Sequence, residues 1–180
     1  MVKIMTKLEM IQKVINGNFV YENEFLEEKK PDFTMRITLS DKNTENKIIY
    51  RFDPDNGAIF PFFSDEKHLN KICDFFVFFE RNNKLYVLIS ELKRGCSSKN
   101  SIANKQLDAS EHFIDFVIKS ANRIGIALKD EDCVIYKLRF SEEYIKKAEK
   151  KQSKFKTPLH GCGNNIYEYR SNCIEFIDFR

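Results

Sequence analysis

The chain has 180 residues, of which 30 are Lys or Arg and 27 are Asp or Glu, giving a formal net charge of +3. This length suffices for one ordinary domain with a buried core and is short for two, so we expect residues 1–180 to form a single domain. No segment approaches the roughly 20 apolar residues that span a bilayer. The first residues lack the apolar run of a signal peptide, and the five Cys include no Cys-x-x-Cys pair. We therefore expect a cytoplasmic protein with reduced thiols and no membrane partner.

The first predicted elements are a helix and two strands. Apolar side chains at helical spacing predict a helix over residues 4–15, which Asn16-Gly17 ends. Alternating patterns predict strands over 33–39 and 47–52, separated by a polar stretch. We expect these two strands to pair with each other as a hairpin beside the centre of the protein.

Residues 72–93 are the centre of the predicted sheet. Two runs rich in β-branched and aromatic residues flank Asn82-Asn83, which predicts an antiparallel hairpin with these two residues as its turn. Counting inward from the turn places Asp74 directly opposite Glu91. Opposed side chains have Cβ atoms roughly 5 Å apart, where like charges repel.

A divalent metal would relieve that repulsion, because hard cations bind converging carboxylate oxygens. Glu91 and Lys93 are two residues apart on one strand, so they project from the same face. We therefore predict that Asp74, Glu91 and Lys93 converge on a cation site.

This constellation, Asp74 followed on the next strand by Glu91-Leu92-Lys93, resembles the catalytic core of the PD-(D/E)xK nuclease superfamily, which includes restriction, repair and phage-defence nucleases. The resemblance runs from the hairpin through the following helix, and Cys73 stands where the family motif has Pro. It implies one or two Mg²⁺ ions, with Mn²⁺ as a substitute, held by Asp74, Glu91 and the backbone carbonyl of Leu92. It also implies that Lys93 orients or deprotonates the attacking water and holds the phosphate.

The resemblance also directs attention to two further positions. Family members often contribute an acidic residue from a helix upstream of the hairpin, and the sequence does not choose among Glu9, Glu24 and Glu28. A predicted helix over 102–121 carries Gln106 in its first turns. In the family a Gln here often reaches the metal or the substrate phosphate, so we count it as a candidate catalytic residue. A residue at the solvent edge of the helix is the alternative. A subset of the family shows Gln-x-x-x-Tyr, whereas Ser110 stands at the last position here.

The C-terminal third is predicted to add strands and a basic segment. A strand over 132–140 precedes a short helix that opens at Ser141, and residues 146–156 hold six lysines. That lysine run is either a solvated surface or an arm that contacts phosphates, and both interpretations stay open. His160 and Cys162 lack two further zinc ligands. Residues 166–170 and 173–179 are predicted to form a last hairpin.

Together these elements predict an α/β fold: a mixed central sheet of about four or five strands flanked by helices on both faces, with a restriction endonuclease-like core and an added C-terminal β-hairpin. The predicted function is that of a Mg²⁺-dependent nuclease, acting on DNA rather than RNA, within a restriction, repair or phage-defence system. A homodimer or an activating partner protein would fit such an enzyme. Two alternatives stay open: a catalytically silent nuclease-fold domain that binds nucleic acid or a partner protein, and an unrelated α/β domain in which Glu91 faces solvent.

Overall fold

The computed structural model describes residues 5–40, 46–52, 60, 71–94, 101–126, 128–142, 145, 159–161 and 165–179. The lysine run 146–156 lies outside these residues, as does most of the short helix predicted after Ser141.

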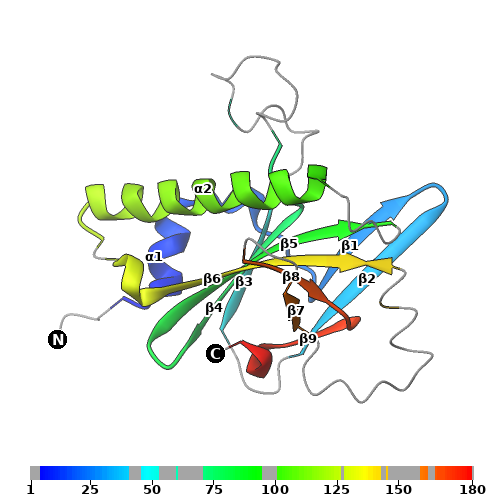
Figure 1. Ribbon diagram of the computed structural model, residues 1–180. Coiled ribbons are helices and arrows are strands. Elements are labelled where there is room, and N and C mark those ends of the chain that lie inside the picture. The colour runs from blue at the N-terminus through cyan, green and yellow to red at the C-terminus, as the bar shows by residue number, and fades with distance from the viewer. Residues whose placement is uncertain are drawn as a thin grey trace.

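A mixed sheet of six strands forms the middle of the described structure (Figure 1). Its strands, in spatial order, are β3 (Lys47–Arg51), β4 (Phe75–Arg81), β5 (Lys84–Lys93), β6 (Cys133–Ser141), β8 (Ile166–Tyr169) and β7 (Leu159–Gly161). Strand β4 runs antiparallel to both β3 and β5. Strands β5, β6 and β8 run parallel to one another, and β7 is antiparallel to β8. The predicted mixed α/β sheet is confirmed at this level.

The central hairpin has the predicted register. Arg81 pairs with Lys84 and Phe75 pairs with Ser90, so the next pair outward is Asp74 with Glu91. The turn residues Asn82 and Asn83 have φ values of 50° and 58°. Two successive positive φ angles match the type I′ turn, whose twist suits a two-residue hairpin and which Asn tolerates.

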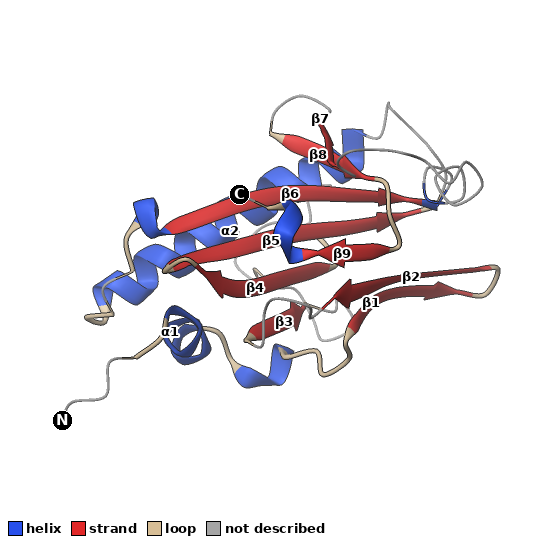
Figure 2. Cartoon of the chain, turned by 90° about the horizontal axis from the view of Figure 1, so that it is seen from below, coloured by secondary structure: helices blue, strands red, loops and turns tan. Residues whose placement is uncertain are grey.

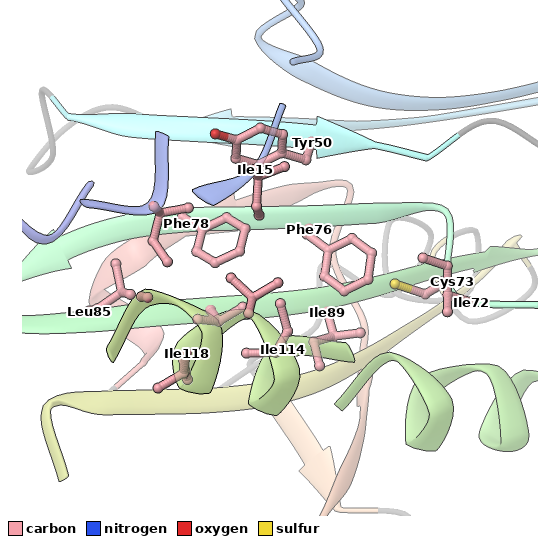
Figure 3. Close-up of a cluster of buried hydrophobic side chains, with 14 of the residues drawn as sticks. Ile15, Tyr50, Ile72, Cys73, Phe76, Phe78, Leu85, Ile89, Ile114 and Ile118 are labelled. Carbon is pink, nitrogen blue, oxygen red and sulfur yellow. The ribbon is translucent and has the colours of Figure 1, made fainter. Parts of the chain in front are cut away.

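Both long helices lie on one face of this sheet. The helix α2 (Ser101–Arg123) crosses the strands, and α1 (Lys7–Val14) packs beside it (Figure 1). The buried stripe of α2 faces the alternate side chains of β4 and β5. In Figure 3, Ile114 and Ile118 meet Phe76, Phe78 and Leu85 in this layer. None of the helices in the described ranges is long and apolar enough to cross a membrane.

A second, smaller sheet covers the opposite face (Figure 2). It contains β1 (Phe25–Lys30), β2 (Phe33–Ser40) and β9 (Cys173–Glu175). Because β4 is apolar on both faces, it needs cover on both. The helices η1 (Gly17–Phe19), η3 (Asp130–Asp132) and η4 (Phe176–Asp178) are single turns. The prediction of helices on both faces was therefore wrong for the described structure: on this side the cover is mainly the small sheet.

Two predicted hairpins were also wrong. The strands predicted over 33–39 and 47–52 exist, but β2 pairs with β1 and β9 while β3 pairs with β4 in the other sheet. At the C-terminus, β8 pairs with β6 and β7, and β9 runs parallel to β2. The chain passes from one layer to the other between the two members of each predicted hairpin. The added C-terminal hairpin across residues 171–172 is thus absent from the described structure.

Candidate active site at the end of the central hairpin

Asp74 and Glu91 meet where the central hairpin opens away from its turn. The backbone N–H of Asp74 donates a 3.1 Å hydrogen bond to Oε2 of Glu91. The backbone N–H of Leu92 donates a 3.0 Å hydrogen bond to Oδ2 of Asp74. Each carboxylate therefore contacts the strand that carries the other. The predicted convergence of the two acids is present in the structure.

Lys93 completes the predicted group, because its ammonium forms an ion pair with Oε1 of Glu91. The Glu91 side chain is fully buried, whereas 25% of the Lys93 side chain is exposed. Lys93 thus lies between the buried carboxylate and solvent. A phosphate that approached Glu91 from solvent would meet this cation.

The two acids have perturbed proton affinities. Burial, and secondarily the charge of Glu28, raise the pKa of Asp74 to about 6. Burial, and secondarily the charge of Asp74, raise the pKa of Glu91 to about 8, although Lys93 acts in the opposite direction. Burial lowers the pKa of Lys93, but the surrounding carboxylates outweigh burial and raise it. Burial thus disfavours the charged forms of both acids, and a neighbouring carboxylate adds to this effect at each of them.

Glu28 is the upstream acid that the structure places at this site. Its charge raises the pKa of Asp74 and of Lys93. The Glu28 side chain is 15% exposed, and its Oε1 pairs with Lys30. Its Oε2 is buried and makes no hydrogen bond within the described residues. Glu28 comes from strand β1 of the small sheet rather than from a helix, so neither spacing nor alternation in the sequence could have selected it.

The other two upstream candidates lie elsewhere. Glu9 belongs to the N-terminal capping box of α1, where it accepts a hydrogen bond from the N–H of Thr6. The next residue after this cap, Lys7, donates its N–H to Glu80 at the turn end of β4. Glu80 lies six residues along the chain from Asp74, at about 3.3 Å per strand residue. Glu24 is exposed and precedes β1.

Gln106 contacts the backbone beside Asp74 rather than the carboxylates themselves. Its Nε2 donates a 3.2 Å hydrogen bond to the carbonyl of Ile72. One turn later, Ser110 accepts a 2.8 Å bond from the N–H of Cys73 and donates one to the carbonyl of Gln106. Helix α2 is therefore bonded to the segment that leads into Asp74. Figure 3 shows Ile72 and Cys73 at one end of the apolar layer under this helix.

A buried row of charged residues continues from Glu91 across the sheet. The register partner of Glu91 on β6 is Arg139, and the partner of Arg139 on β8 is Glu168. The guanidinium of Arg139 bonds Oε2 of Glu168 at 2.7 Å, and both side chains are buried. Sequence analysis missed this pair, because the strand order that joins β6 to β8 was unknown.

These groups fit a magnesium ion better than a softer metal, because all the candidate ligands are oxygens. Within the described residues, no group of three or more His, Cys, Asp and Glu side chains is arranged to hold a metal. Magnesium does not need such a cage, since it is commonly bound through one or two carboxylates plus water and substrate phosphate. A cation between the two buried acids would favour their charged forms, whose pKa values burial raises.

Comparisons with protein-family models, with curated protein sequences and with solved structures found no match to this chain. The geometry and charges of the site are therefore the basis for a functional proposal.

Proposed function

We propose that this protein is a Mg²⁺-dependent nuclease that hydrolyses phosphodiester bonds, with DNA favoured over RNA as substrate. The observation that carries the proposal is the reciprocal bonding of Asp74 and Glu91 beside Lys93, at the open end of an internal hairpin. Two acids and a lysine that converge in this way supply the groups that metal-assisted phosphodiester hydrolysis requires. The resemblance of Asp74 and Glu91-Leu92-Lys93 to the PD-(D/E)xK motif supports the same reaction.

Asp74, Glu91 and the backbone carbonyl of Leu92 would hold the ion, and Mn²⁺ would substitute for Mg²⁺. When bound, such an ion lowers the pKa of its water and stabilises negative charge on the scissile phosphate. Each carboxylate uses one oxygen to accept a backbone N–H, namely Oδ2 of Asp74 and Oε2 of Glu91. These bonds fix the orientation of both groups before any ligand arrives, which is the preorganisation that catalysis exploits.

Lys93 acts as a fixed positive charge. Its pairing with Glu91 favours the ammonium form, so at neutral pH it holds the substrate phosphate and orients the attacking water. A protonated lysine is a poor general base. We therefore assign Lys93 an electrostatic role, the first of the two that the resemblance allows.

The experiment is cleavage of plasmid, single-stranded DNA and RNA by the purified protein with Mg²⁺, with Mn²⁺ and with EDTA. The variants are Asp74→Asn and Glu91→Gln. Glu27→Gln is the matched control, because Glu27 loses a carboxylate in the same way but pairs with Arg36 on the outer face of the β1–β2 hairpin. We expect metal-dependent cleavage that Asp74→Asn and Glu91→Gln abolish and Glu27→Gln retains.

Metal-independent cleavage, or cleavage that survives both site substitutions, would contradict the proposal. Binding of nucleic acid without any cleavage would favour the catalytically silent alternative. A partner protein that activates cleavage would keep the same site residues, so the substitutions would be repeated in its presence.

A further inference from the structure

An exposed ion pair joins the end of β5 to the turn of the β1–β2 hairpin. Arg94 directly follows Lys93, and its guanidinium pairs with the carboxylate of Asp32 in that turn. The two side chains are 59% and 66% exposed. Exposed pairs of this kind contribute little to stability. Arg94 can therefore exchange Asp32 for another anion at little cost.

A second pair on the same hairpin lies next to the candidate active site. Lys30 pairs with Glu28, whose charge acts on both Asp74 and Lys93. Leu26, Glu28 and Lys30 are two residues apart on β1, so they share the face that packs toward the large sheet. The cations Lys30 and Lys93 thus come from two elements around one group of carboxylates.

The arrangement of the strands brings this hairpin to the mouth of the site. In Figures 1 and 2 the β1–β2 turn lies toward the same end of the molecule as the C-terminal ends of β5 and β6. The Arg94–Asp32 pair joins the two segments at that end. Consecutive Cα atoms are about 3.8 Å apart, so Lys93 and Arg94 lie at the same end of β5, beside this turn.

We propose that the β1–β2 hairpin forms one wall of the substrate groove, and that Asp32 occupies in the free protein the place that a backbone phosphate of the nucleic acid takes on Arg94. This inference rests on the proposed function, since it assumes that the polymer runs past Asp74 and Glu91. A guanidinium binds a phosphate through two parallel hydrogen bonds and matches its geometry as well as it matches a carboxylate. The exchange releases the Asp32 side chain to water and moves no buried group.

The exchange gives the two partners of the pair opposite effects on binding. Arg94→Gln removes a phosphate contact and is expected to weaken binding about 3- to 10-fold. The slope of the logarithm of the binding constant against the logarithm of the salt concentration should also fall, by the amount that about one phosphate contact contributes. Asp32→Asn removes the competing carboxylate and is expected to tighten binding about 2- to 5-fold. A pair that only stabilised the fold would make both substitutions act in the same direction.

The outer face of the same hairpin supplies the controls. Arg36 pairs with Glu27 there, and its side chain is 57% exposed, close to the value for Arg94. Arg36→Gln and Glu27→Gln therefore change the net charge equally without touching the proposed wall. We expect both to bind within about twofold of the wild type, because a charge beyond a Debye length is largely screened.

Binding would be measured with the full chain by fluorescence anisotropy of labelled single-stranded and duplex DNA, in EDTA to prevent metal-dependent cleavage, over a range of NaCl concentrations. Thermal melting would show that each variant is folded. If Arg94→Gln and Asp32→Asn match the outer-face controls, or if both weaken binding, the inference is wrong. Wild-type protein that binds neither DNA would also overturn it.

The two proposals fail separately. Cleavage that depends on Asp74, combined with normal binding by Arg94→Gln, would reject the hairpin wall and keep the nuclease. Opposite effects of Arg94→Gln and Asp32→Asn, without cleavage under any condition, would keep the wall and reject the nuclease.

Discussion

Asp74 and Glu91 each bind the backbone of the strand that carries the other. Glu91 accepts the N–H of Asp74 at 3.1 Å, and Asp74 accepts the N–H of Leu92 at 3.0 Å. Two carboxylates that only repelled each other would turn apart. Here the backbone N–H groups hold them together, while burial raises both pKa values. The hydrogen bonds preorganise the site for a cation, and the burial of two carboxylates makes their charged forms unfavourable without one.

The first prediction separates the structural and the catalytic roles of Asp74. In Asp74→Asn the amide oxygen still accepts the N–H of Leu92, so we expect stability close to that of the wild type and no metal-dependent cleavage. In Asp74→Ala that partly buried N–H loses its acceptor, which costs about 1–3 kcal/mol. Urea denaturation of both variants in EDTA measures the difference. Equal stabilities would show that the hydrogen bond contributes nothing.

The second prediction concerns the pH dependence of stability without metal. The pKa of Asp74 is raised from 3.8 to about 6, and that of Glu91 from 4.5 to about 8. The folded protein therefore binds protons more tightly than the unfolded chain does, so the free energy of unfolding falls as pH rises from about 4 to about 8. One pKa unit corresponds to about 1.4 kcal/mol, so the two shifts together predict a loss of several kcal/mol.

Glu91→Gln is the variant that tests this assignment, because it removes the larger shift and should flatten the pH profile measured in EDTA. Added Mg²⁺ should raise the melting temperature more at high pH than at low pH, since the ion competes with protons for the same oxygens. A pH profile that Glu91→Gln leaves unchanged would assign the dependence to other groups.

The parts of the fold that sequence analysis predicted correctly are those set by local patterns. The register that opposes Asp74 to Glu91 follows from a two-residue turn and a period of two. The buried stripe of α2 follows from helical spacing. Neither depends on where the rest of the chain lies.

What sequence analysis missed depends on long-range pairing. Strand β1, with the sequence Phe-Leu-Glu-Glu-Lys-Lys, has no apolar alternation. Its position beside the site depends on the packing of the small sheet against β4 and β5, which the sequence of β1 does not indicate. Glu28 and the Arg94–Asp32 pair were therefore beyond local patterns. The pairing of β6 with β8, which creates the Arg139–Glu168 pair, was missed for the same reason.

The third prediction separates cation binding from catalysis at Lys93. Lys93→Gln removes the positive charge beside Glu91, which competes with a metal ion for that carboxylate. We expect Mn²⁺ to bind at least as tightly as in the wild type, as measured by isothermal titration calorimetry. We expect cleavage to fall by about a hundredfold or more, because the phosphate loses its fixed cation. Weaker Mn²⁺ binding in this variant would instead make Lys93 a structural support for the acids.

The fourth prediction separates a positioning role of Gln106 from direct contact with the substrate. Its bond to Ile72, together with the bonds of Ser110, indicates a residue that positions Asp74 through the backbone. We expect Gln106→Ala and Ser110→Ala to lower kcat with little change in KM. A raised KM with an unchanged kcat for Gln106→Ala alone would mean that the side chain contacts substrate directly, as the family resemblance implies.

The fifth prediction concerns the buried ion pair of Arg139 with Glu168, in the row that continues from Glu91. Breaking such a pair leaves an uncompensated buried charge, so Glu168→Gln should cost about 3–5 kcal/mol. Arg139→Met combined with Glu168→Leu replaces both charges by apolar groups and should recover most of that loss. Urea denaturation of Arg139→Met, Glu168→Leu and the double variant completes the double-mutant cycle. Additive losses would show that the two charges do not depend on each other for burial. Recovered stability without recovered cleavage would mean that Arg139, the neighbour of Glu91 in register, also acts on the site.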